Sequence, residues 1–259
     1  MKDVQNEKDT RNQEIQKVGV KGVRYPITVL DKKEGFQHTV ATVNMYVDLS
    51  PHFKGTHMSR FIEILNKYRG QIGIKELTSI IQEMKKKLKA KSAFVEIEFP
   101  YFIEKQAPVT KATGFMEYKC KFLAFSKDST IDLCIEVNVP ISTVCPCSKA
   151  ISTHGAHNQR GTVRLKVRSK KLVWIEDLIK LVESSVSSDL YTILKRPDEK
   201  YVTERAYENP MFVEDVVREI AVKLKNDPNI VWFLVEAENY ESIHNHNAYA
   251  CIEWVRPIP

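Results

Sequence analysis

Two cysteines and two histidines gather within VPISTVCPCSKAISTHGAHNQRG, the segment that spans residues 139–161. A single proline separates Cys145 from Cys147, whereas two cysteines that chelate one zinc ion usually have roughly two to four residues between them. The spacing therefore favours one thiol as a metal ligand and its neighbour as a group that transfers a proton. His154 and His157 follow in a loop that contains glycine, where either imidazole could turn toward an ion.

Two further segments carry residue types that suit a site. In YESIHNHNAYA, His244 and His246 are two positions apart, so both side chains leave the same face if the backbone is extended. The stretch KRPDEKYVTERAYENPMFVED is dense in carboxylates, most of which we expect to be solvated loop charges. Glu214 differs from them because it adjoins an apolar stripe near the start of a predicted helix, where a carboxylate could reach into a pocket.

Several classes of function are disfavoured. The chain has no GxxxxGK[ST], GxGxxG or GxSxG motif, so any nucleotide would not be held by a glycine loop. The net charge is +6, and we interpret the lysine-rich run at 85–91 as a solvated helix face without a nucleic-acid partner. No run of about 18 apolar residues predicts a membrane span. The charged first residues lack the apolar core of an export signal, and the odd number of cysteines is typical of the reducing cytoplasm.

Alternating apolar residues predict the strands that must position these groups. They are clearest in the ranges 38–49, 95–99, 116–122, 131–139, 163–167, 230–237 and 247–255. Apolar residues at helical spacing predict helices around 58–65, 77–84, 175–182 and 213–220. We expect the last of these helices to start at Asn209 and Pro210, as an N-cap and first helical residue.

Strand, strand, helix, helix, strand, strand is therefore the predicted order, and it occurs twice. Small antiparallel sheets with helices on one face make an α+β protein, and their open edges favour an oligomer. From the residues alone we reach a cytoplasmic α+β protein with a Cys/His metal site and a hydrolytic or thiol-based chemistry.

Six segments resemble the GTP cyclohydrolase type IB family, the alternative class of GTP cyclohydrolase I. They are KGTHMSRF at 54–61, CPCSKAIS at 145–152, GAHNQRG at 155–161, RPDEKYVTE at 196–204, NPMFVEDVVR at 209–218 and HNHNA at 244–248. The resemblance implies a bimodular tunnelling fold of two ββααββ modules, which form a barrel in an oligomer. We expect a disordered or loosely attached arm at 1–20 and modules at 21–126 and 127–259.

The family resemblance implies the reaction as well. Its members hydrolyse GTP with water to 7,8-dihydroneopterin triphosphate and formate, the entry step to tetrahydrofolate and, in many bacteria, to queuosine. The resemblance implies a homotetramer with active sites at subunit interfaces. It also implies one divalent ion per active site, zinc, manganese or iron, held by Cys145, His157, Glu199 and His244. One thiolate and two imidazoles suit zinc or iron, and the carboxylate admits manganese.

The remaining roles follow from that resemblance and from chemistry. Water made nucleophilic by the ion would attack C8 of guanine, and Cys147 and His246 are the candidates for moving the proton that ring opening requires. Glu214 resembles the glutamate that accepts hydrogen bonds from the 2-amino group and N1–H of guanine. The cations expected to meet the triphosphate are Lys149, Arg160 and Arg196.

Two alternatives stay open from the sequence. The first is a tunnelling-fold enzyme that reduces a nitrile on a deazapurine with a cysteine nucleophile and NADPH, without a catalytic metal. The second is a scaffold protein in which the Cys/His set is structural. A carboxylate in the ligand set argues against the second, because structural zinc is normally closed by four Cys/His ligands.

Overall fold

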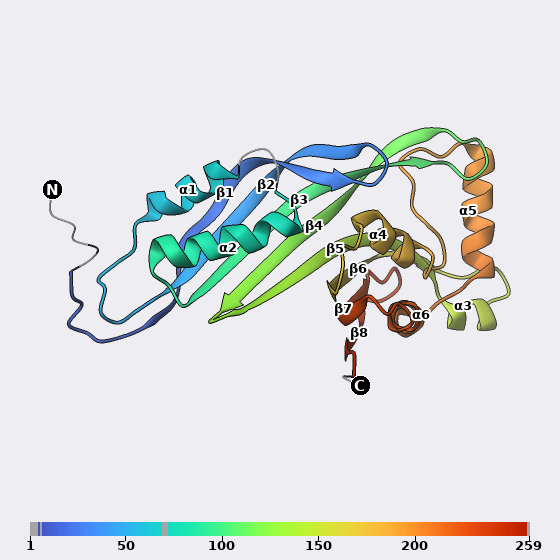
Figure 1. Cartoon of the computed structure of the whole chain (residues 1–259). Helices are drawn as coiled ribbons and strands as arrows, with labels where there is room; N and C mark the ends of the chain where they lie inside the picture. The colour runs from blue at the N-terminus through green and yellow to red at the C-terminus, as the bar shows by residue number, and fades with distance from the viewer. Residues whose placement is uncertain (1–4, 6, 69–71, 258–259) are drawn as a thin grey trace. The chain divides into compact units, whose positions relative to one another are not determined.

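The strands of this chain hydrogen bond to one another in the order in which they occur in the sequence, from β1 to β8. The computed structural model describes residues 5, 7–68 and 72–257, which contain eight strands and six helices (Figure 1). The strands are β1 (Ile15–Asp31), β2 (Gly35–Leu49), β3 (Ser92–Gln106), β4 (Thr113–Lys127), β5 (Thr130–Val144), β6 (Asn158–Ser169), β7 (Ile230–Asn239) and β8 (Ala248–Val255). The helices are α1 (Met58–Lys67), α2 (Ile74–Leu88), α3 (Pro146–Ile151), α4 (Ile175–Glu183), α5 (Arg196–Glu208) and α6 (Val213–Asn226).

Neighbouring strands run antiparallel in the pairs β1–β2, β2–β3, β5–β6, β6–β7 and β7–β8. The predicted α+β class is confirmed. The chain divides into two compact units, one comprising Met1–Pro100 and Lys121–Cys134, the other Tyr101–Cys120 and Ile135–Pro259. Strands β3, β4 and β5 each contribute residues to both units, and the module limits expected from the sequence stay a prediction.

In the first unit, α1 and α2 lie along one face of the strands (Figure 1). The stripe predicted on α2 is fully buried, and its residues are Leu77, Ile80, Ile81 and Met84. Alternate residues of β2 and β3 are buried too, among them Val43 and Val95. Each such side chain stabilises the fold by roughly 1.5–3 kcal/mol through its removal from water. The core of this unit therefore lies between the two helices and the sheet.

In the second unit, α6 packs against β7 and β8, and α4 contacts α6 (Figure 1). The predicted helical stripes are buried, and they are Ile175, Leu178, Ile179 and Val182 on α4 and Val213, Val216, Val217 and Ile220 on α6. Strand β6 buries the alternating residues Val163, Leu165 and Val167, as its pattern predicts. The spacing of apolar residues therefore predicted the positions of α4, α6 and β6 correctly.

The predicted start of α6 is wrong. Asn209 caps the C-terminus of α5, and α6 begins four residues later at Val213. Pro210 has no N–H and cannot continue a helix, so it separates α5 from α6 instead of opening α6. Asp215 marks the true start, because its carboxylate accepts a hydrogen bond from the Phe212 backbone N–H at 3.0 Å.

The segment expected to be an N-terminal arm lies partly outside the described residues. Within the described part, β1 begins at Ile15, so the end of that segment belongs to a strand. Further upstream, the backbone N–H of Lys54 donates to the Glu7 carbonyl at 3.0 Å, and that of Gly55 donates to the Gln5 carbonyl at 3.1 Å. These bonds attach Gln5 and Glu7 to the loop before α1.

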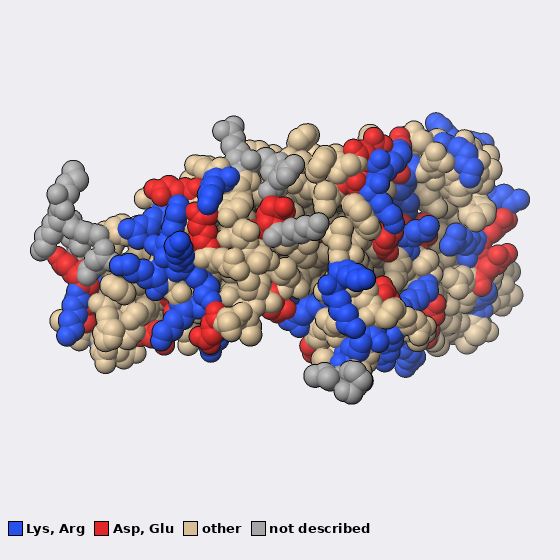
Figure 2. All heavy atoms as spheres, in the orientation of Figure 1, with Lys and Arg blue, Asp and Glu red and all other residues tan. Residues whose placement is uncertain are grey.

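Basic side chains gather at the C-terminal end of α2 (Figure 2). Lys85, Lys86 and Lys87 occupy its last turn, where positive charge is favourable beside the negative end of the helix dipole. Lys87 lies 3.2 Å from the carboxylate of Glu83. The helix dipole and the contact with Glu83 therefore explain why several lysines of the run at 85–91 are favourable at this position. Among the described residues, no helix has both the length and the apolar character that crossing a membrane requires.

Candidate active site

The cysteine segment forms a short turn between β5 and β6. Cys145 has extended backbone angles and caps α3, with Pro146 as the first helical residue. Its Sγ accepts a hydrogen bond from the Ser148 backbone N–H at 3.5 Å, and its own N–H donates to the His157 carbonyl at 3.1 Å. The Ser148 hydroxyl in turn accepts from the His157 N–H at 3.1 Å. These contacts bring the backbones of two predicted ligands, Cys145 and His157, side by side.

The imidazole of His157 has two polar neighbours at the same ring nitrogen. Its Nδ1 lies 3.0 Å from Gln159 Oε1 and 3.3 Å from Ser242 Oγ. Ser242 belongs to the connection between β7 and β8, so this contact places that connection beside His157. The backbone agrees, because the Tyr240 N–H donates to the Arg160 carbonyl at 2.8 Å.

His244 and His246 lie in the same connection and both are exposed. Their rings stack with centroids 5.1 Å apart and an angle of 10° between the planes. The backbone bends at 242–246 and is not extended, so the condition of that expectation is not met, although the two rings do lie against each other. Cys147 is exposed as well, so both candidates for proton transfer are accessible to solvent in the chain taken alone.

Glu214 lies in the first turn of α6 and is exposed. The segment before this helix reaches the cysteine turn, because the Met211 N–H donates to the Val144 carbonyl at 3.0 Å. Val144 immediately precedes Cys145. The start of α6 therefore lies at the same end of β5 as the predicted ligands Cys145 and His157.

Glu199 and Arg196 are exposed on α5, a helix that the sequence pattern missed. Asp198 and Ala206 are the residues of α5 described as buried, so the helix carries no apolar stripe that a periodicity search could find. Local signals for its start do exist, since Pro197 lies in the first turn and is followed by two acidic residues.

Asp198 anchors α5 through a fully buried carboxylate. It accepts hydrogen bonds from the backbone N–H groups of Val109 and Thr110, each at 2.8 Å, from the Thr110 hydroxyl at 2.6 Å and from the Lys195 N–H at 2.9 Å. Burial alone would raise the pKa of this carboxyl, but these hydrogen bonds hold the pKa well below its usual range. The charge therefore persists, and the neighbouring Glu199 has a fixed helical frame.

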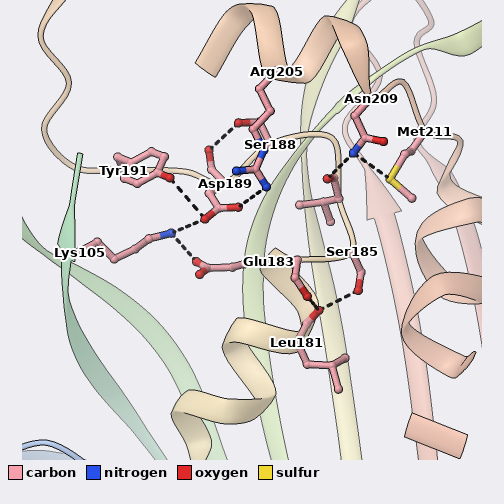
Figure 3. A network of polar contacts seen from close by, with 12 residues as sticks. Lys105, Leu181, Glu183, Ser185, Ser188, Asp189, Tyr191, Arg205, Asn209 and Met211 are labelled. Carbon is pink, nitrogen blue, oxygen red and sulfur yellow. Dashed lines mark hydrogen bonds and ion pairs between the residues drawn. The ribbon is translucent and has the colours of Figure 1, made fainter. Parts of the chain in front are cut away.

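A second polar network fixes the chain between α4 and α5 (Figure 3). Lys105 Nζ lies 2.8 Å from Glu183 Oε1 and 3.6 Å from Asp189 Oδ2. The Tyr191 hydroxyl donates to Asp189 Oδ2 at 3.4 Å, and Arg205 of α5 lies 3.9 Å from the other oxygen of Asp189. Burial and the Asp189 charge raise the pKa of Tyr191 to about 12, which keeps its hydroxyl protonated as a donor. The network thus connects α5 to β3 and α4.

One of the three predicted phosphate-binding cations already has protein partners. The Lys149 ammonium donates to the carbonyl of Tyr207 near the C-terminus of α5 and lies 4.4 Å from the centroid of the Tyr207 ring. It therefore joins α3 to α5. Arg160 is exposed, as is Arg196 at the start of α5.

Within the described part of this chain, no group of three or more His, Cys, Asp or Glu side chains is close enough together to hold a metal ion. The four-ligand set stays a prediction. Cys145 and His157, whose backbones meet, carry donors that fit a divalent cation, since a thiol and an imidazole suit zinc or iron. The contact at His157 Nδ1 fits as well, because histidine ligands commonly use one nitrogen for the metal and the other for a hydrogen bond.

Gln159 and Thr143, whose roles the sequence pattern did not indicate, lie behind His157. The Gln159 amide donates from Nε2 to the Thr143 hydroxyl oxygen at 2.9 Å, and both residues are buried. A signal was present, because extending the alternation of Val163, Leu165 and Val167 back along β6 places Gln159 in the buried phase. A polar residue in that phase needs internal hydrogen-bond partners.

The fold defines the broader class of the protein. Uricase from Arthrobacter globiformis has a TM-score of 0.55 at 7% sequence identity, with 93% of each chain covered. Urate oxidase from Bacillus subtilis 168 has a TM-score of 0.55 at 10% identity, covering 93% of this chain and 99% of its own. A highly active mutant of urate oxidase from Bacillus sp. TB-90 has a TM-score of 0.57 at 12% identity, covering 93% and 100%. This chain therefore has the tunnelling fold of these oxidases.

Sequence comparison narrows the class to one family. A family model described as type I GTP cyclohydrolase folE2 matches residues 1–250. GTP cyclohydrolase FolE2 of Syntrophobacter fumaroxidans (strain DSM 10017 / MPOB) is 64% identical over 255 residues, covering 98% of this chain and 99% of the relative. The protein of that name from Desulfosudis oleivorans (strain DSM 6200 / JCM 39069 / Hxd3) is 61% identical over 260 residues, with both chains fully covered. The chain belongs to the type I GTP cyclohydrolase FolE2 family, and the predicted resemblance is confirmed.

Proposed function

We propose that this chain is a GTP cyclohydrolase of tetrahydrofolate biosynthesis, which converts GTP and water to 7,8-dihydroneopterin triphosphate and formate. Family membership along nearly the whole chain supports this activity. The observation that carries it in the structure is the meeting of three segments at the end of β5. The Cys145 N–H bonds the His157 carbonyl, Ser242 contacts the His157 ring, and Met211 bonds Val144 just before Glu214.

The proposed site holds one divalent ion, zinc, manganese or iron, through Cys145, His157, Glu199 and His244. Such an ion supplies a water of lowered pKa and a positive charge beside the purine. Cys145 and His157 already lie together, whereas the described residues of one chain do not complete the set. We therefore include in the proposal a homotetramer with its active sites at subunit interfaces, where a neighbouring subunit can contribute donors.

Glu214 is the proposed anchor for guanine. A carboxylate at the start of α6 can accept hydrogen bonds from the 2-amino group and N1–H of guanine, a donor pair that adenine lacks. The helix N-terminus also stabilises its negative charge before substrate arrives. Selection of GTP over ATP follows from this one residue.

The proposal also assigns the proton carriers and the phosphate contacts. Cys147 and His246 lie two positions from Cys145 and His244, so either can move a proton to a ring nitrogen during imidazole opening. Lys149, Arg160 and Arg196 are proposed to meet the triphosphate. Lys149 can do so while it keeps Tyr207, because an ammonium has three donors.

A cytoplasmic location completes the proposal. All five cysteines are free thiols, which is typical of proteins from a reducing compartment. The alternatives of a thiol-dependent nitrile reductase and of a metal-binding scaffold are not favoured by the family match.

The decisive experiment separates metal binding from guanine recognition. Glu214→Ala is expected to keep its metal and to lower kcat/KM for GTP by at least about 100-fold, because two hydrogen bonds to a charged group are lost, each worth about 1.5–3 kcal/mol. Formate release and pterin fluorescence measure turnover, and elemental analysis measures metal. Glu219→Ala, on the exposed side of the same helix, is the matched control and should retain both. Unchanged turnover in Glu214→Ala would remove this residue from the mechanism.

A further inference from the structure

Gln159 links the His157 ring to the buried part of the second unit. Thr143 of β5 and Gln159 of β6 face each other across the antiparallel pair. Thr143 is fully buried and Gln159 is 8% exposed, so neither side chain can exchange its hydrogen-bond partner freely for water. The position of the Gln159 amide is therefore determined by its protein neighbours.

The two ends of that amide have opposite hydrogen-bonding capacity. Gln159 Nε2 donates to Thr143 Oγ1 at 2.9 Å, and the carbonyl oxygen Oε1 of the same amide lies 3.0 Å from His157 Nδ1. A carbonyl oxygen can only accept, so His157 must carry its proton on Nδ1 to make this bond. A neutral imidazole protonated on Nδ1 has its free lone pair on Nε2.

Ser242 is compatible with the same state of the ring. Its hydroxyl oxygen lies 3.3 Å from His157 Nδ1 and can accept a share of the same N–H. The backbone of His157 is held independently, by Ser148 Oγ at its N–H and by the Cys145 N–H at its carbonyl. Backbone and ring are thus both fixed, and Nε2 is the one polar atom of this residue left to meet a ligand.

We propose that Gln159, oriented by Thr143, is a positioning residue that keeps His157 in its Nδ1–H form and presents Nε2 to the metal ion. This inference rests on the proposed function, in which His157 is a ligand. Hydrogen-bond partners behind metal-binding histidines typically contribute about 10- to 100-fold to metal affinity. Gln159 accordingly governs affinity for the ion without touching the ion or GTP.

Two nearly isosteric substitutions test the hydrogen bond between Gln159 and His157 and the hydrogen bond between Gln159 and Thr143. Gln159→Leu removes the nearer acceptor at Nδ1 and leaves only the longer contact with Ser242, and Thr143→Val removes the hydroxyl that bonds the amide while it keeps a β-branched residue in β5. Thr162→Val is the matched control, because Thr162 lies on β6, the strand of Gln159, and its hydroxyl bonds Tyr240 and not Gln159 or His157. Thermal unfolding of each variant checks that the fold is retained, and Thr143→Val carries the test should Gln159→Leu not fold.

The first measurement needs neither metal nor substrate. In metal-free protein with ¹⁵N-labelled histidine, nitrogen chemical shifts report which ring nitrogen is protonated, and His157→Asn identifies the signal among the seven histidines. The unchanged protein and Thr162→Val should show His157 protonated on Nδ1, whereas Gln159→Leu and Thr143→Val should show loss of that preference. A proton on Nε2 in the unchanged protein would overturn the proposal.

The second measurement is zinc affinity, determined by competition with a chromophoric chelator. Gln159→Leu should bind zinc about 10- to 100-fold more weakly, with a smaller loss in Thr143→Val and none in Thr162→Val. If His157→Asn binds zinc as tightly as the unchanged protein, the ligand assignment in the proposed function is wrong. If His157→Asn loses zinc while Gln159→Leu keeps its affinity within about twofold, the ligand assignment stands and the role of Gln159 is wrong.

Discussion

At the scale of single residues, the side chains expected to do chemistry are accessible and the side chains that hold them are buried. Cys147, Glu199 and His244 are exposed, whereas Thr143 and Asp198 are fully buried. A buried polar group left without its partner costs about 1–3 kcal/mol, so the buried residues keep one arrangement. Substitution of an exposed residue is therefore expected to change chemistry, and substitution of a buried one to change geometry.

Cys145→Ala is expected to lose bound metal and GTP turnover together, because it removes the thiolate from the proposed ligand set. We expect metal affinity to fall by more than about 100-fold. This loss is larger than the loss of affinity expected when only a hydrogen-bond partner of a metal ligand is removed. Helix α3 should survive, since Pro146 and the Lys149 contacts remain. Elemental analysis and formate release are the measurements. Cys147→Ala is the comparison, expected to keep its metal and lose about 10²- to 10⁴-fold in rate. A full equivalent of metal in Cys145→Ala would contradict its role as a ligand.

At the scale of elements, helices with an apolar stripe were predicted from their spacing, whereas α3 and α5, which have none, were not. Helices α2, α4 and α6 bury the residues that their spacing selects. Helix α5 is held by the hydrogen bonds of Asp198 and by the ion pairs around Asp189. These partners are far apart in the chain, so no local pattern announces them.

A contact between α1 and α2 predicts how the stability of the fold depends on pH. Glu83 of α2 accepts hydrogen bonds from Lys67 Nζ at 2.8 Å and from the Tyr68 hydroxyl at 3.1 Å. The Lys67 bond holds the pKa of Glu83 below its ordinary value, although burial opposes this. A carboxyl with a lowered folded-state pKa stabilises the protein above its unfolded-state pKa, and that stability disappears as the pH falls through the folded-state pKa.

Glu83→Gln should therefore lower the free energy of unfolding at pH 7 by about 1 kcal/mol. The difference from the unchanged protein should shrink as the pH falls below about 4.3, the ordinary pKa of glutamate, because the unfolded chain then binds a proton that the folded protein does not yet bind. Denaturant titrations at pH 7 and at successively lower pH values measure it. Glu63→Gln, on the exposed face of α1, is the control and should show neither effect. A difference that grows on acidification would contradict the assignment.

At the scale of the whole molecule, the two strands at the ends of the strand order are the elements with an open edge. Strands β1 and β8 stand at those ends, so each pairs with one neighbour in the chain alone. Strand β8 also exposes large side chains, with Tyr249 at 59% and Val255 at 65%. An unpaired strand edge with apolar side chains favours association with another subunit.

We accordingly expect the metal-loaded protein to be a homotetramer at micromolar concentration. Light scattering coupled to size exclusion should give a mass close to four times that of one chain. Glu214→Ala should assemble equally well, since the proposed role of this residue is confined to guanine. A monomer that turns over GTP at full rate would show that the site is complete in one subunit and would exclude the proposed interface sites.

By itself, the sequence determined the local periodicity of apolar residues and the identity of the reactive residues. Periods of two and of about 3.6 residues placed strands and helices, because burial on one face is a local property of spacing. Six short segments were sufficient to indicate the family, which the comparison over residues 1–250 confirmed. Only the tertiary structure decided that Pro210 ends α5, that Asp198 anchors it to Thr110, and that Gln159 lies behind His157. The bonds of Asp198 to Thr110 and of Gln159 to Thr143 join segments that are far apart in the sequence, so they form only when the chain has folded.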